Sequence, residues 1–170
     1  MNGKFLLFLL IVALDQWTKF LAGQHLALGV PAAVIPGLFN FTLVYNPGAA
    51  FGMFSELPDA WRRITLAIVS GIALIVVLRF MAKEAKHDRA SQYALIAILS
   101  GAVGNLIDRY RFDSVVDFLD FYWKNYHWPA FNIADSAISI GVVVLMFRVL
   151  FTKSEKAAEA DSSGATFSTL

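Results

Sequence analysis

The chain has 170 residues, of which 58% are hydrophobic and 16% are charged, and its mean hydropathy is +0.60. This composition is too apolar for an ordinary soluble domain and is typical of a membrane protein. A net charge of +1 gives no basic surface for nucleic acid, and the absence of cysteine excludes disulfides, thiolate catalysis, cysteine metal sites and S-acylation.

The first apolar segment begins like a signal peptide, because Lys4 precedes an unbroken apolar run over residues 5–14. Gln24 stands where a lipoprotein signal would need its cysteine. We therefore predict that residues 5–22 form a retained first transmembrane helix.

The outer half of this helix carries three polar residues on one face. Asp15, Thr18 and Lys19 are spaced i, i+3 and i+4, which allows Asp15 and Lys19 to pair. Ionisable groups at that depth are expected to face other helices rather than lipid. The simplest interpretation is a structural ion pair that locks this helix to its neighbours.

Residues 23–60 contain no Lys or Arg and hold four of the five prolines, so we predict an extramembrane loop. Within it, residues 39–45 alternate so that Phe39, Phe41, Leu43 and Tyr45 share one face, which predicts a half-buried strand. A turn at residues 46–48 follows, and the apolar residues 49–54 are too short to cross a bilayer and are expected at its interface. Together they indicate a small sheet on the membrane surface.

Three further apolar segments predict spans at about residues 64–81, 93–107 and 133–151. The third span ends in Asn105, Asp108 and Arg109, which repeat the i, i+3, i+4 spacing on one helical face. At the start of the fourth span, one stripe holds Asn132, Asp135, Ser136 and Ser139.

Basic residues indicate the orientation of this four-span bundle. One side would carry Lys4, Lys83, Lys86, Arg89, Arg148, Lys153 and Lys156. The other side holds residues 23–60, which have none, together with Arg62, Arg63, Arg109, Arg111 and Lys124. The excess places both termini in the cytoplasm. The tail over residues 153–170, rich in Ala, Ser and Glu, is expected to be disordered.

The segment between the last two spans places Asp117 and Asp135 at the ends of an aromatic loop. Its rings are Phe118, Phe121, Tyr122, Trp123, Tyr126, Trp128 and Phe131, which match the aromatic belt found at headgroup level. At 1.5 Å per residue, Asp135 lies roughly 27 Å from Lys153, close to the hydrocarbon thickness of about 30 Å. The two acids can therefore meet at the outer membrane face.

Elimination leaves paired carboxylates as the available chemistry. The three histidines are scattered, and a metal site built from Asp117, Asp120 and His127 lacks a helical ligand spacing. Two aspartates held close share one proton, so that one acts as general base on water while the other hydrogen-bonds the scissile carbonyl. On the residues alone Asp120 is an equally available acid, and Asp117 or Asp135 could serve as a helix cap.

Five motifs together resemble the lipoprotein signal peptidase family, also called signal peptidase II. They are Asp15-Gln16-x-Thr18-Lys19, Asn46-Pro47-Gly48-Ala49-Ala50-Phe51-Gly52, Gly101-x-x-Gly104-Asn105-Leu106-Ile107-Asp108-Arg109, Val115-Val116-Asp117-Phe118 and Phe131-Asn132-x-Ala134-Asp135-Ser136. The match runs in order from about residue 4 to residue 151. One departure is Ser100-Gly101, where the family often has paired glycines.

The resemblance implies an aspartic endopeptidase of the bacterial cytoplasmic (inner) membrane, with its active site near the outer face. Such enzymes use no cofactor or metal, cut prolipoproteins before a diacylglyceryl cysteine within membrane lipid, and are inhibited by globomycin. The family's catalytic aspartates fall on Asp117 and Asp135, which decides between Asp117 and Asp120. Substrate-binding positions fall on Asn46, Gly48, Arg109, Asn132 and Ala134, and supporting positions on Asp15, Lys19, Asn105 and Asp108.

The fold implied is an all-α membrane protein with a single integral-membrane domain over residues 1–152. Its four-helix bundle would carry a small extracytoplasmic β-sheet cradle and an interfacial aromatic-rich loop or helix. Two other classes stay open. An ion translocator would place acids near the bilayer midplane and show a repeat, and a scaffold protein would use the polar residues only to join helices.

Overall fold

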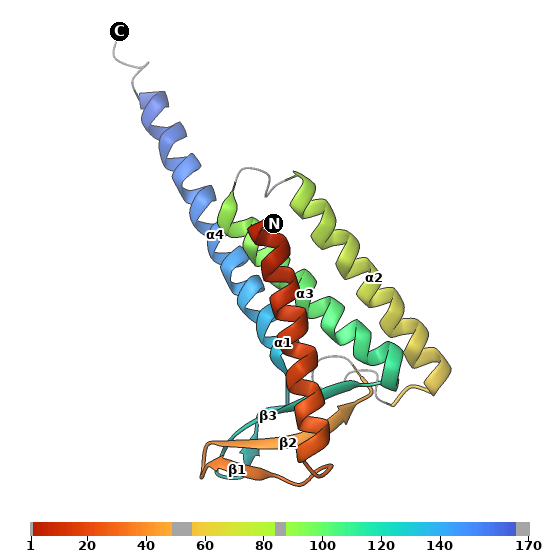
Figure 1. Cartoon of the computed structure of the whole chain (residues 1–170). Coiled ribbons are helices and arrows are strands. Elements are labelled where there is room, and N and C mark those ends of the chain that lie inside the picture. The colour runs from red at the N-terminus through yellow and green to blue at the C-terminus, as the bar shows by residue number, and fades with distance from the viewer. Residues whose placement is uncertain (1, 49–55, 84–87, 166–170) are drawn as a thin grey trace.

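The computed structural model describes residues 2–48, 56–83 and 88–165, and Figure 1 shows their arrangement. In chain order the elements are α1 (Gly3–His25), β1 (Ala32–Ile35), β2 (Phe39–Asn46), α2 (Asp59–Lys83), α3 (Arg89–Phe112), β3 (Val115–Trp123), β4 (Tyr126–His127) and α4 (Ile133–Ala165). The sheet lies at one end of the helices, and the N-terminal end of α1 and the C-terminal end of α4 lie at the other. α3 contacts each of the other helices.

Each of the four predicted spans lies within one of these helices. Among the described residues, α1 and α3 are long and apolar enough to cross a bilayer by length and mean hydropathy, so a fourfold crossing stays a prediction. Residues 49–54, which we expected at the interface, lie outside the described residues. Residues 84–87 of the charged connection between α2 and α3 lie outside them too.

The expectation of a disordered tail from residue 153 onward differs from the structure. The last helix, α4, continues without a break to Ala165. Alanine, lysine and glutamate have high helix propensity, and residues 153–160 consist of these three types together with a single serine, Ser154. A helix that is already formed extends into such a sequence at little cost.

The sheet is antiparallel, in the order β1-β2-β3-β4. The strand predicted at residues 39–45 is confirmed as β2. The prediction of an aromatic loop or helix after Asp117 is wrong, because residues 115–123 form the long strand β3. Its valines and aromatic residues favour a strand, and β2 supplies a partner along its length, from Val115 opposite Asn46 to Phe121 opposite Phe39.

The predicted alternation along β2 holds only in part. The register of β2 on β3 shifts between Phe41 and Val44, so the simple period of two is interrupted there. Asn40 and Thr42 are buried, while Tyr45 is 42% exposed. The polar side chains on β2 are buried because they have a polar partner on β3, which is described below.

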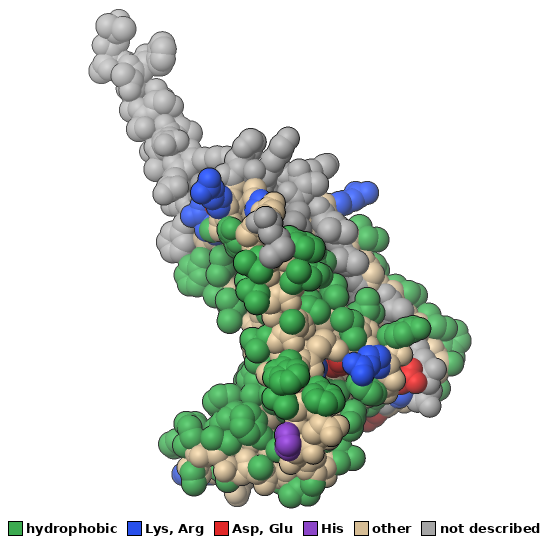
Figure 2. All heavy atoms as spheres, in the orientation of Figure 1, with side chains coloured by type: hydrophobic (Ala, Val, Ile, Leu, Met, Phe, Trp, Pro, Cys, Tyr) green, Lys and Arg blue, Asp and Glu red, His purple; other side chains and the backbone are tan. Residues whose placement is uncertain are grey.

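Helix α1 is polar toward the protein and apolar toward its surroundings. Its buried residues are Asp15, Lys19 and Ala22. Between Phe5 and Phe20 its exposed large side chains are apolar, namely Phe5, Leu6, Leu9, Leu10, Leu14, Trp17 and Phe20, and the exposed polar residues Gln24 and His25 lie at its C-terminal end. Figure 2 shows hydrophobic side chains over much of the helices on the visible face, with Lys and Arg near the end that holds the N-terminus and also at the sheet end. This inversion is expected of a helix surrounded by lipid.

A small hydrophobic cluster attaches the outer end of α1 to the sheet. It consists of Ala22 from α1, Leu43 from β2, and Val116 and Phe118 from β3. All four side chains are at most 6% exposed. Because this contact fixes the last turns of α1 against β3, the polar residues one turn earlier are held beside the strand that carries Asp117.

Helices α3 and α4 approach each other closely through glycine. A Cβ atom added at Gly101 would lie 2.3 Å from the carbonyl oxygen of Ala134, and one added at Gly141 would lie 2.6 Å from that of Ala94. Ser100, which stands where a second glycine was expected, is fully buried and donates its hydroxyl to the Ile96 carbonyl at 2.6 Å. The departure therefore leaves the close contact of α3 with α4 intact.

Candidate active site

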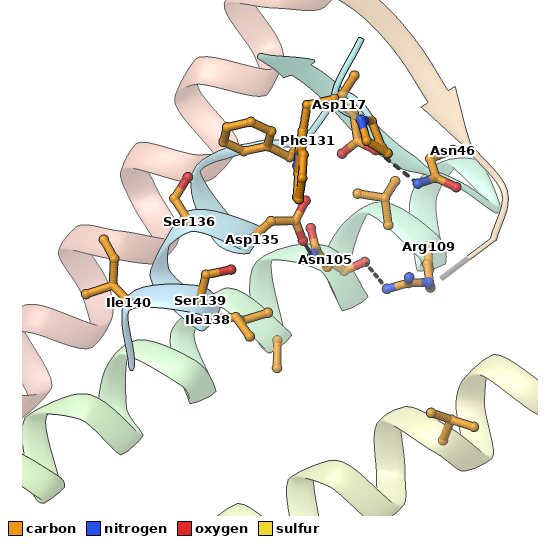
Figure 3. A pocket seen from close by; sticks show the side chains of 16 residues that line it. Asn46, Asn105, Arg109, Asp117, Phe131, Asp135, Ser136, Ile138, Ser139 and Ile140 are labelled. Atoms are coloured by element: carbon orange, nitrogen blue, oxygen red, sulfur yellow. Dashed lines mark hydrogen bonds between the residues drawn. The ribbon is translucent and has the colours of Figure 1, made fainter. Parts of the chain in front are cut away.

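A cavity of about 630 Å³ lies where the sheet meets α3 and α4, and Figure 3 shows its lining. The side chains of Asp117 and Asp135 both line this cavity, although 17 positions of the sequence separate them. Toward the sheet the wall is polar, with Asn46, Asn105 and Arg109. Farther along α4 and on α2 the wall becomes apolar, with Ile138, Ile140 and Val69.

Asp117 is the third residue of β3 and is only 2% exposed. Its Oδ1 accepts a hydrogen bond from Asn132 Nδ2 at 2.7 Å, and its Oδ2 accepts one from Asn46 Nδ2 at 3.1 Å. Strand pairing places Asn46 here, because β2 runs alongside β3 and ends next to its start. Both oxygens of Asp117 are thus held by amide donors.

Asp135 lies in the first turn of α4. Its Oδ1 accepts a hydrogen bond from Asn105 Nδ2 of α3 at 2.7 Å, and its Oδ2 accepts one from the backbone N–H of Asn132 at 3.3 Å. The second contact is that of a helix-capping acid, as the sequence allowed. The hydrogen bond from Asn105 is not a capping contact, because it joins α4 to α3 and holds the carboxylate beside the cavity.

Asn132 connects the two acids directly. This residue is fully buried immediately before α4. Its Nδ2 donates to Asp117 Oδ1, while its Oδ1 accepts the backbone N–H of Asp135 at 2.9 Å. One rigid side chain therefore fixes the strand-borne carboxylate relative to the helix-borne one.

Burial and the neighbouring acid change the acidity of Asp117. Its pKa is raised to about 7, chiefly by burial and next by the negative charge of Asp135, while the hydrogen bonds from Asn46 and Asn132 act in the opposite direction. An acid with a pKa near 7 exchanges its proton close to physiological pH, and in a pair of neighbouring acids that proton belongs to the pair.

Arg109 approaches the same cavity from α3. Its Nη2 donates to the carbonyl oxygen of Gly48 at 3.2 Å, and the backbone N–H of Gly48 donates to Asn46 Oδ1 at 3.0 Å. Its Nε is buried and has no hydrogen-bond partner among the described residues. A guanidinium group with an unused donor beside a cavity is suited to bind a carbonyl oxygen.

A lysine-centred cluster lies directly behind the two acids. Lys19 Nζ contacts Asp15 Oδ2 at 2.9 Å, Asp108 Oδ2 at 2.8 Å and Asn105 Oδ1 at 2.9 Å. The predicted pairing of Asp15 with Lys19 is confirmed. All four side chains are buried, and a buried charge of this kind requires such partners.

The competing acid, Asp120, has a different environment. Its carboxylate contacts His127 Nδ1 at 2.8 Å, Thr42 Oγ1 at 2.9 Å and Asn40 Nδ2 at 3.2 Å. It does not line the cavity. The alternative metal site is not assembled either, because no group of three His, Asp or Glu side chains in the described part of the chain is arranged to hold an ion.

Some residues of the site were not identified from the sequence as candidates. Gln16 Nε2 contacts Asp108 Oδ1 at 3.0 Å and the carbonyl of Gly104 at 3.1 Å, so it joins α1 to α3. Val116 provides a backbone N–H to Asp108. Residues 128–131 form one wall of the cavity. Gln16 and Val116 each stand next to a singled-out residue, but a backbone contact leaves no sequence pattern.

Comparison with known proteins identifies relatives that match most of the chain. The model of the signal peptidase II family matches residues 7–151. The lipoprotein signal peptidase of Desulforapulum autotrophicum is 49% identical over 144 residues, which are 85% of this chain and 89% of that protein. The lipoprotein signal peptidase of Syntrophus aciditrophicus is 45% identical over 147 residues, with 86% and 91% covered.

Two solved structures resemble the fold of this chain. One bacterial membrane enzyme, solved at 2.3 Å, has a TM-score of 0.81 and 34% identity to this chain, with 91% of each chain covered. A second, solved at 1.9 Å, has a TM-score of 0.74 and 33% identity, with 87% of this chain and 92% of the other covered. Both the helices and the small sheet are thus shared with enzymes of known structure.

Proposed function

Since this chain belongs to the signal peptidase II family, and is therefore a peptidase and a membrane protein, we propose that it is an aspartic endopeptidase. Its substrates are prolipoproteins that carry a diacylglyceryl group on cysteine, and it cuts immediately before that cysteine. Asp117 and Asp135 are the catalytic residues. The observation that carries this proposal is the arrangement of these two buried carboxylates on one cavity, joined through Asn132.

The chemistry follows from one proton shared between two acids. The ionised carboxylate removes a proton from a water molecule, whose oxygen attacks the scissile carbonyl carbon. The protonated partner donates its proton to the carbonyl oxygen, which gives a tetrahedral diol. The pair then gives its proton to the leaving nitrogen and the C–N bond breaks, while one hydroxyl of the diol returns its proton to a carboxylate, so that the pair again holds a single proton.

Several polar groups are suited to hold the substrate backbone near the cut. Arg109 has an unused Nε donor at the cavity, and its contact with Gly48 connects α3 to the end of β2. We place Asn46, Gly48, Arg109, Asn132 and Ala134 in substrate binding. Globomycin-type inhibitors would occupy the same cavity, because they compete for these groups.

The position of the cavity suits a substrate that is anchored in lipid. It lies at the sheet end of the bundle, opposite the chain termini, and its far wall is apolar. We assign the sheet end to the outer face of the bacterial inner membrane and both termini to the cytoplasm. The acyl chains and signal helix then contact the apolar walls of α2 and α4 while the peptide bond reaches the acids.

The test compares Asp117→Asn and Asp135→Asn with the wild type on a diacylglyceryl-modified prolipoprotein in detergent. Both variants should lose cleavage by more than about 10³-fold while unfolding cooperatively, since an amide can neither take nor give the proton. Asp120→Asn is the matched control, because it removes a buried acid three residues away on the same strand that does not line the cavity. It should still cleave.

Chelators separate this mechanism from metal-dependent hydrolysis. Cleavage by the wild type should be unchanged by excess EDTA. Normal cleavage by either Asp117→Asn or Asp135→Asn, or loss of cleavage in Asp120→Asn alone, would refute the assignment of the two catalytic residues.

A further inference from the structure

The ammonium group of Lys19 uses all of its hydrogen-bonding capacity inside the protein. It has three protons and no acceptor. Its three contacts are with Asp15 Oδ2, Asp108 Oδ2 and Asn105 Oδ1, at 2.8–2.9 Å. Lys19 is 4% exposed, so no proton is left for a substrate. Any hydrogen-bonded effect of Lys19 on catalysis must therefore pass through these three neighbours, whereas its charge acts through space.

Two of these neighbours hold the residues that directly precede the paired acids. Asp15 Oδ1 accepts the backbone N–H of Ala134 at 2.9 Å, and Asp135 follows Ala134 in the chain. Asp108 Oδ2 accepts the backbone N–H of Val116 at 3.1 Å, and Asp117 follows Val116. Lys19 therefore joins the anchor of the strand-borne acid to the anchor of the helix-borne acid.

The third neighbour contacts Asp135 itself. Because an ammonium group can only donate, the atom that Asn105 turns toward Lys19 must be its oxygen. Its Nδ2 must then face the other way, where it donates to Asp135 Oδ1 at 2.7 Å. Asn132 Nδ2 also donates to this oxygen, at the longer distance of 3.2 Å, so without Lys19 the amide keeps only the weaker of its two orienting contacts.

We propose that Lys19 is a positioning residue for the two acids: through Asp15, Asp108 and Asn105 it fixes their spacing and orients the amide that binds Asp135. The proposal rests on the proposed catalytic role of Asp117 and Asp135. Lys19 also acts as a charge in the site. The charged groups that face the pair are Asp15 and Lys19 from α1 and Asp108 and Arg109 from α3.

A charge effect gives a readout that loss of packing does not produce. Burial and Asp135 raise the pKa of Asp117, and the positive charge of Lys19 opposes them. Removal of this charge therefore raises the pKa at which the pair loses its last proton. The alkaline limb of the kcat profile should move upward in pH.

The experiment measures kcat, KM and the pH profile of Lys19→Met with a diacylglyceryl-modified prolipoprotein, together with thermal unfolding in detergent. A displacement of about 1 Å at catalytic groups typically lowers kcat about 100-fold, and KM should change far less because Lys19 does not line the cavity. The matched control is Lys4→Met, which removes the other lysine of α1 that binds α3, through Gln92, near the opposite end of the helix. It should retain the wild-type kcat and pH profile.

A second variant tests the proposal even if Lys19→Met does not fold. Asn105→Asp keeps the size of the side chain and its contact with Lys19, but replaces the amide donor to Asp135 by a carboxylate. It should lower kcat and shift the alkaline limb to higher pH. A wild-type kcat and pH profile in either variant, with Asp117→Asn inactive, would overturn the role of Lys19 alone. Cleavage by Asp117→Asn would instead overturn the proposed function.

Discussion

The close contact between α3 and α4 sets the distance between Asn105 and Asp135, and Gly101 makes this contact possible. A Cβ atom at position 101 would lie 2.3 Å from the Ala134 carbonyl oxygen and 2.8 Å from Ile138 Cγ1, whereas ordinary contacts begin at 3.4 Å. The carbonyl belongs to the backbone and cannot rotate away. In Gly101→Ala the two helices must therefore separate by about 1 Å at this level.

The separation acts on the site because Ala134 precedes Asp135. The hydrogen bond from Asn105 on α3 to Asp135 on α4 is 2.7 Å long, and a 1 Å increase would break it. We expect Gly101→Ala to lower kcat about 100-fold, as misplacement by this amount typically does, and to destabilise the fold by about 1–3 kcal/mol through overpacking.

Cleavage of the diacylglyceryl-modified prolipoprotein and thermal unfolding in detergent measure the two effects separately. Gly71→Ala in α2 is the control, because an added Cβ there meets nothing within 4 Å, and alanine favours the helix. The control should retain full kcat with an unchanged or higher unfolding midpoint. If folded Gly101→Ala cleaves within about threefold of the wild-type rate, the α3–α4 spacing does not control the acids.

Two further predictions concern the dependence of stability on pH. Ionising Asp117, whose pKa is raised from 3.8 to about 7, costs the folded state about 4 kcal/mol. Asp117→Asn should therefore unfold at a higher temperature than the wild type at pH 8, and the gap should narrow as the pH falls from about 7 toward 3.8, below which both states keep the proton; a gap that stays constant would contradict this. Burial alone would raise the pKa of Asp120, but the hydrogen bonds from His127, Asn40 and Thr42 outweigh burial and lower it. Asp120→Asn should then cost about 2 kcal/mol at neutral pH, and wild type and variant should converge as the pH falls below 3.8 through the lowered pKa; a difference that grows in acid would be inconsistent with the contacts described.

The helices were predictable because lipid imposes a simple requirement on sequence. A run of about 20 apolar residues is easily recognised in a sequence. The i, i+3, i+4 spacing of Asp15, Thr18 and Lys19 identified the inward face of α1, where Asp15 and Lys19 are buried. The strand β3 was not predictable in the same way. Its residues are as apolar and aromatic as an interfacial loop, and only the partner strand β2, about 75 positions earlier, makes them a strand.

The choice between Asp117 and Asp120 shows the same limit at the site. They are three positions apart, so the pleat of β3 turns their side chains to opposite faces of the sheet. One face receives Asn46 and Asn132, and the other receives Asn40, Thr42 and His127. The residues alone left both acids available, and the family resemblance chose Asp117. The structure supplies the physical difference between them.

The asparagines around the two acids explain how a buried pair can hold a single negative charge. Asn46 Oδ1 accepts the N–H of Gly48, Asn105 Oδ1 accepts the Lys19 ammonium, and Asn132 Oδ1 accepts the N–H of Asp135. Each of these neighbours can only donate, so each amide must turn its N–H₂ group toward a carboxylate. Three charge-assisted hydrogen bonds then stabilise the first negative charge, while burial and mutual repulsion oppose the second. These groups cannot reverse their orientation, and in the proposed mechanism they keep a single proton on the pair.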